Sequence, residues 1–173
     1  TANGLDVKDS VKLASAAALA ACTYHNGNGT LTGDANGALS VDGVAVAVND
    51  RILIKDQADA KQNGIYKVTA TGGASAVFVL TRTPDADTAA ELTGGTFFFA
   101  EAGSANADNG YVSTHNGTPT FGTTDLTFSQ FSGAGQISAG TGLTKTGNTL
   151  NAIAGSGITV NANDIQISAS YVG

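Results

Sequence analysis

The chain has 173 residues, a formal net charge of −6, and only 13% charged and 6% aromatic residues. An acidic chain repels phosphate backbones and no apolar run is long enough to span a bilayer, so we expect neither nucleic-acid binding nor membrane insertion. The single cysteine, Cys22, excludes an intrachain disulfide and a zinc site of several cysteines. Since the sequence contains no Met, we expect it to be a segment of a longer chain.

The first two predicted elements precede residue 49. Apolar and polar side chains alternate over residues 5–13, which predicts a strand there, although the alanines that follow favour helix. Asp42-Gly43 then suits a two-residue type I′ turn, which needs positive φ. We therefore predict a hairpin with strands at 38–41 and 44–48.

Short strands follow in quick succession. After the turn residues Asn49-Asp50, a strand is predicted at 51–55 with Ile52 and Ile54 on one face, and a polar loop covers 56–62. The remaining predicted strands are 65–68, 77–81, 96–99, 111–113 and 126–128. This spacing predicts an all-β fold, a small antiparallel sandwich or barrel.

The composition changes near residue 132. Beyond it, Lys145 and Asp164 are the only charged residues, and apart from Tyr171 the rest are small, amide or aliphatic. The Gly-Ala-Gly sequence at 133–135 is a flexible joint in this interpretation. We predict a globular β domain at 1–132 and a shaft segment at 133–173 that continues in a longer chain.

The shaft segment contains an internal repeat. Residues 140–154 align without gaps on 155–169, a period of 15. Apolar positions fall in pairs two residues apart, so each unit predicts two short strands with one apolar face. In the second copy these positions hold Ile158, Val160, Ile165 and Ile167, and in the first copy Leu143, Lys145, Leu150 and Ala152.

An isolated hairpin of this kind is marginally stable, and its open edges invite pairing with other chains. We therefore expect the repeat to fold only in association with other chains. The predicted interface residues are Leu143, Leu150, Ile158, Val160, Ile165 and Ile167.

Several blocks in residues 4–132 resemble one known family. DGVAVAVNDRILIKDQ at 42–57, NGIY at 63–66 and LTRTPDAD at 80–87 are similar to a module of bacteriophage tail-fibre and related virion proteins, and residues 5–12 and 33–43 fit it too. Tyr111 stands where many members carry Trp. The 15-residue units resemble triple β-spiral repeats of viral fibre shafts. These resemblances imply structure and attachment, with no catalytic motif to transfer.

The sequence therefore predicts a non-enzymatic virion component: a trimeric tail fibre or fibre adaptor that joins tail or baseplate proteins to a distal receptor-binding tip. Two alternatives stay open. The globular part is instead an adhesion module that binds host surface glycan, or the chain is a fragment of a polysaccharide depolymerase. A depolymerase needs paired carboxylates flanking a groove, and no pair stands out in the sequence.

The candidate binding residues also have simpler interpretations. Arg51, Lys55 and Arg82 are candidates for contact with an acidic sugar or a lipopolysaccharide phosphate, although charges on outer strand faces are more often solvated or paired with aspartate. Asp85, Asp87 and Glu91 are spaced like part of a calcium loop, but Thr88 and Glu91 fit a capping box better. Cys22 and His25 are two ligands, too few for a metal site. We predict no metal, no cofactor and no catalytic residue.

Overall fold

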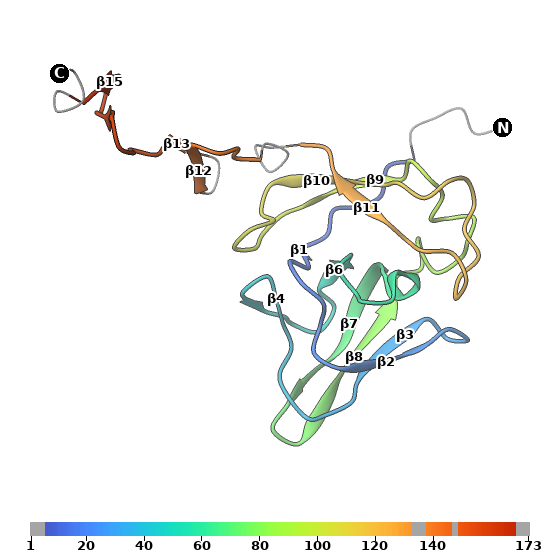
Figure 1. Cartoon of the computed structure of the whole chain (residues 1–173). Coiled ribbons are helices and arrows are strands. Elements are labelled where there is room, and N and C mark those ends of the chain that lie inside the picture. Colours follow the sequence, from blue (N-terminus) through green and yellow to red (C-terminus); the bar gives the residue numbers. More distant parts are fainter. Residues whose placement is uncertain (1–5, 133–137, 147–148, 169–173) are drawn as a thin grey trace. The chain divides into compact units, whose positions relative to one another are not determined.

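The computed structural model describes residues 6–132, 138–146 and 149–168. The chain divides into two compact units, Thr1–Ser132 (unit 1) and Gly133–Gly173 (unit 2). Figure 1 shows short strands joined by turns and loops, and the described residues contain no α-helix. The predicted all-β class is confirmed. The predicted joint at 133–135 lies outside the described residues.

Unit 1 is built around a six-stranded sheet with the order β1-β6-β7-β8-β3-β2. Its strands are β1 Leu13–Ala14, β2 Cys22–His25, β3 Thr30–Gly33, β6 Arg51–Ile54, β7 Gly64–Gly73 and β8 Ala76–Arg82. The pairs are antiparallel except β1 with β6, which is parallel. The sheet is therefore mixed rather than purely antiparallel.

A second sheet of three antiparallel strands, β11-β10-β9, lies beside the first in the same unit. Its strands are β9 Phe97–Ala100, β10 Asn109–Ser113 and β11 Phe128–Gln130. The strand predicted at 126–128 therefore begins two residues late. Leu126 is instead a buried loop residue, whose N–H donates to the carbonyl of Ala60, in the 3₁₀ turn η1 Ala60–Gln62.

Strand β6 divides its side chains between two hydrophobic cores. Ile52 and Ile54 pack in one core with Tyr66 and other residues of the six-stranded sheet. Leu53 points the other way and packs with Phe98 of β9 in the second core. This follows from the two-residue period of a strand and confirms that Ile52 and Ile54 share a face. The second core joins the two sheets.

Residues 6–15 link the same two sheets. Val7 and Val11 form single parallel bridges to Phe97 and Ala100 of β9. The chain then crosses to β6, where Lys12 N–H donates to the Arg51 carbonyl at 2.7 Å and β1 begins at Leu13. The strand predicted at 5–13 was thus wrong in extent: the described part of this segment is extended, but regular pairing starts only at its last residue. Its Leu5 end lies outside the described residues.

The predicted hairpin at Asp42-Gly43 is confirmed. Strands β4 Ser40–Val41 and β5 Val44–Ala45 pair across it, and Asp42 and Gly43 have φ of 48° and 76°. Both strands are shorter than predicted. Asn49 also has positive φ, 74°, in the predicted turn before β6.

The described residues of unit 2 form two hairpins, one for each copy of the repeat. In the first, β12 Leu143–Thr146 pairs with β13 Thr149–Ala152; in the second, β14 Ile158–Val160 pairs with β15 Ile165–Ile167. The prediction of two short strands per repeat is confirmed.

Candidate functional site

The second hairpin of unit 2 carries one entirely aliphatic face. Ile158 lies opposite Ile167, and Val160 lies opposite Ile165. Directly opposed residues share a face, as do residues two apart on one strand. All four side chains therefore lie together, while Thr159 and Gln166 occupy the reverse side. Ile165 and Ile167 remain 62% and 65% exposed, so the described residues of unit 2 leave this face largely uncovered.

The first hairpin repeats this arrangement with a charged exception. Leu143 is paired with Ala152, and Lys145 with Leu150, at positions 15 residues before their counterparts in the second hairpin. Lys145 is half-buried although its neighbours Leu143 and Leu150 are exposed. A lysine can lay its methylene chain along an apolar face and keep its ammonium group in water.

The two hairpins also share their entry turns. Gly142 and Gly157 have φ of 89° and 87°, a region that favours glycine. The Gly142 carbonyl accepts from Ile153 N–H, and the Gly157 carbonyl accepts from Ser168 N–H, both at 3.0 Å. The 15-residue period therefore describes backbone geometry as well as sequence. The residues predicted for a trimer interface are gathered on these two largely aliphatic faces, which we call the hairpin faces.

Arg82, a candidate ligand contact, lies inside unit 1. It is 3% exposed, and its guanidinium carbon lies 4.4 Å from the ring centroid of Phe121, 5.0 Å from that of Tyr66 and 5.4 Å from that of Tyr24. Its Nη2 donates to the Tyr24 hydroxyl at 3.1 Å and the Asn63 carbonyl at 3.0 Å.

Nη1 of Arg82 has no hydrogen-bond partner among the described residues and packs on Gly64, where a Cβ would collide with it. Protein atoms therefore surround the Arg82 side chain. It contributes to packing in the interior of unit 1, where cation–π contacts hold its guanidinium group.

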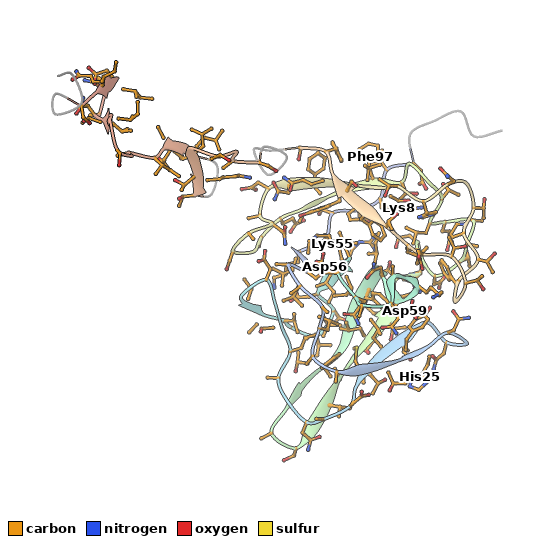
Figure 2. All side chains as sticks on the ribbon, viewed as in Figure 1. Lys8, His25, Lys55, Asp56, Asp59 and Phe97 are labelled. Carbon is orange, nitrogen blue, oxygen red and sulfur yellow. The ribbon has the colours of Figure 1, made fainter. Side chains whose placement is uncertain are left out.

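The other two candidate cations are paired. Arg51 donates to both carboxylate oxygens of Asp85 at 2.7 Å, and Lys55 lies 3.0 Å from Asp56. Burial alone would raise the pKa of Asp85, but the hydrogen bonds and the positive charge of Arg51 outweigh it and hold that pKa below its usual value. Figure 2 labels Lys55 and Asp56 side by side in unit 1. Each cation is thus engaged within the chain.

One half of the predicted capping box forms in the acidic turn after β8: the Glu91 side chain reaches back to Thr88, but the Thr88 hydroxyl does not accept from Glu91 N–H, and no helix begins there. The Glu91 carboxylate accepts from the Thr88 N–H at 3.1 Å and from its hydroxyl at 2.8 Å, and Glu91 N–H donates back to the Thr88 carbonyl. Asp85 is occupied by Arg51. In the described ranges no group of three His, Cys, Asp or Glu side chains is arranged as a metal site.

Cys22 and His25 stand at the two ends of β2. Residues three apart on a strand point to opposite faces, so they do not converge on a shared ion. Burial raises the pKa of the Cys22 thiol, which disfavours the reactive thiolate, and Gln57 Nε2 lies 3.4 Å from its sulfur. His115 is buried elsewhere, with Nε2 2.9 Å from the Leu92 carbonyl. No Cys–His pair suited to nucleophilic catalysis is formed by these residues.

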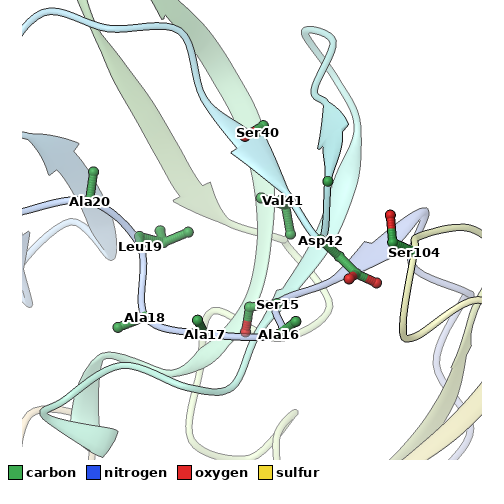
Figure 3. A pocket seen from close by; sticks show the side chains of 11 residues that line it. Ser15, Ala16, Ala17, Ala18, Leu19, Ala20, Ser40, Val41, Asp42 and Ser104 are labelled. Atoms are coloured by element: carbon green, nitrogen blue, oxygen red, sulfur yellow. The ribbon is translucent and has the colours of Figure 1, made fainter. Parts of the chain in front are cut away.

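An open depression of about 300 Å³ lies between the alanine segment 16–20 and the β4–β5 hairpin (Figure 3). Its charged residue is Asp42, and that carboxylate already accepts from the backbone N–H groups of Ala105 and Asn106. The rest of the lining is mostly alanine, serine and backbone. The depression therefore presents few side-chain groups that could recognise a ligand.

Sequence reasoning missed Asn63 and Asn106, two buried residues whose side chains form hydrogen bonds between loops. Asn106 donates to the carbonyls of Ala14 and Ser15 and accepts from the Tyr111 hydroxyl at 2.6 Å. Burial raises the pKa of Tyr111 to about 12, so this hydroxyl remains a donor at neutral pH. Asn63 similarly donates to the carbonyls of Lys55 and Leu126.

Comparison with family models, with curated proteins and with solved structures gave no match for this chain. Within the described residues there is no helix of a length and hydropathy that would cross a bilayer.

Proposed function

We propose that this protein is a trimeric fibre or fibre-adaptor segment of a bacteriophage virion, which links the particle to a distal receptor-binding tip. The observation that carries the proposal is the pair of hairpin faces in unit 2, which repeat every 15 residues and are left exposed by the described residues of that unit. Exposed, nearly uncharged strands of this kind need partners that cover them. Three identical chains supply such partners along one axis.

Two further features support a mechanical role. The sequence blocks of unit 1 resemble a module of tail-fibre and related virion proteins. The cations that a glycan-binding role would use, Arg51, Lys55 and Arg82, are engaged in internal contacts. A depolymerase role lacks a support of this kind, because the carboxylates described above are engaged with Arg51, Lys55, Thr88 or backbone N–H groups.

The mass in solution tests this function. Light scattering on the full chain is expected to give three times the 17.1 kDa chain mass. A glycan array and a sugar-release assay on host capsule are expected to be negative. A monomer at every concentration would overturn the fibre proposal, and sugar release would replace it with the depolymerase.

A further inference from the structure

The second sheet of unit 1 has an apolar outer face that the described residues of this unit leave uncovered. Phe98 points inward to the core, so Phe97 and Phe99 on the same strand point outward. The ring of Phe131 stands edge-on to both, with centroids 5.8 Å from each. Val7, bridged to Phe97, extends the same surface. We call Val7, Phe97, Phe99 and Phe131 the phenylalanine patch. Figure 2 labels Phe97 at this sheet.

The patch is exposed and uncharged. Val7 is 60% exposed, Phe99 47% and Phe131 46%. In the register of the sheet, Val112 and Gly110 lie opposite Phe97 and Phe99, so the outer face continues without charge. Lys8, next to Val7 in the chain, is paired with Asp6 at 3.1 Å.

A backbone hydrogen bond and a glycine fix the position of Phe131 on the sheet. Its N–H donates to the Gly110 carbonyl at 2.9 Å, and a Cβ at Gly110 would lie 2.6 Å from the Cζ atom of the ring. The missing side chain at Gly110 thus lets the Phe131 ring lie against the strands. The ring covers neighbouring aromatic edges yet keeps nearly half of its own surface in water.

The size of the patch limits what covers it. From their exposures, these side chains offer roughly 300 Å² of apolar surface, since a Phe presents on the order of 200 Å² when free. A stable interface between free proteins uses about 800 Å² on each partner. The patch alone is therefore too small to hold an untethered protein. A smaller contact area is enough for a partner that a second contact already holds nearby. A short tether gives such a partner an effective concentration in the millimolar range.

Such a tether follows from the chain itself. Phe131 precedes Leu143, the first residue of β12, by 12 residues. An extended chain covers about 40 Å over that length, so any assembly of the hairpin faces keeps the copies of Phe131 close together. We propose that the phenylalanine patch binds a second copy of this chain, so that unit 1 domains touch one another in the trimer. This inference rests on the proposed function, because the hairpin faces provide the tether.

A cross-linker placed in the patch tests the contact directly. In the full chain, Phe131 is replaced by p-benzoylphenylalanine, an aromatic residue that keeps the ring, and the purified protein is irradiated. Val48, an exposed apolar residue of unit 1 outside the patch, receives the same cross-linker as the control. Cross-linked dimers and trimers are expected from position 131 and not from position 48.

The outcomes separate the two proposals when light scattering is run on the same samples. A trimer that yields no product from position 131 overturns the patch inference and leaves the fibre function standing. A monomer overturns both. As a second measure, a chain with Phe99→Ser and Phe131→Ser is expected to dissociate at a concentration at least about tenfold higher than wild type, because apolar burial at three contacts is lost. An unchanged dissociation concentration would also overturn the inference.

Discussion

The aliphatic side chains of the strands are mostly buried in unit 1 and mostly exposed in unit 2. In unit 1, Ile52, Ile54 and Leu53 of one strand are fully buried, because sheets or loops of the same chain cover both faces of β6. In unit 2, Ile165 and Ile167 are more than half exposed, because each hairpin has a single sheet layer. Strands of similar composition therefore end in different environments.

The difference shows what is needed for a β-strand to be stable alone. The two sheets of unit 1 allow a single chain to bury two hydrophobic cores. A two-stranded hairpin buries little, so its stability depends on what docks on it. Unit 1 is thus expected to fold independently of concentration, while unit 2 depends on association.

The largest expected effect comes from a charge in the second hairpin face. Val160→Asp would place a carboxylate among Ile158 and Ile165 in each of three chains, at a cost of at least several kcal/mol for the trimer, through desolvation and mutual repulsion. The trimer is expected to dissociate while unit 1 remains folded, as measured by light scattering and circular dichroism.

The matched control is Thr159→Asp, which adds the same charge to the reverse side of the same strand. It is expected to leave the trimer intact. Equal loss of trimer in both variants would mean that the aliphatic face is not the contact.

Arg82→Leu is expected to weaken unit 1 and spare the trimer. The change removes three cation–π contacts and leaves the Asn63 carbonyl without its donor, so the free energy of unfolding should fall by about 3 kcal/mol. Urea denaturation measures this loss. Lys67→Leu, at an exposed site on the paired strand β7, is the control and should change the free energy by less than about 0.5 kcal/mol.

Lys145→Val is expected to make the first hairpin face resemble the second. Removing the charge and adding apolar burial should stabilise the trimer by about 1 kcal/mol per chain and raise the melting temperature of the associated state. Thr144→Val, on the reverse side of β12, should give no such gain. If Lys145→Val instead lowered the melting temperature, the ammonium would have a required partner in the assembly.

The smallest effect concerns pH and belongs to unit 1. The pKa of Asp85 is lower in the folded state than in the unfolded chain, so its contribution is present above pH about 4 and lost as pH falls through the folded pKa. Because Asp85 is partly exposed, the contribution is about 0.5–1 kcal/mol. Urea titrations from pH 6 to 2 should show a shallower acid loss for Asp85→Asn than for wild type. Parallel curves would contradict this assignment.

Local patterns in the sequence predicted most of what is local in the fold. Asp42-Gly43 indicated its turn, and the 15-residue repeat indicated which side chains share each hairpin face. Both depend on neighbours within a few residues. The pairing of residues 6–15 with two different sheets depends on partners roughly 40 to 90 positions away, which no short pattern specifies.

The environment of Arg82 was also beyond local reasoning. A charged residue at the end of a strand is usually expected on the surface. Its burial depends on Tyr24, Tyr66 and Phe121, which come from three distant segments, and on the space left by Gly64. Only the tertiary arrangement brings these together.

The parallel bridges between residues 7–11 and β9 have a consequence under load. Strand β11 also runs parallel to β9, because both are antiparallel to β10. Tension applied at residue 6 and at residue 132 would therefore pull the two edges of one sheet in opposite directions along the strands. Hydrogen bonds loaded in this shear direction must break together rather than one after another. Unit 1 is expected to transmit tension along the chain with high resistance to extension, which single-molecule stretching can measure.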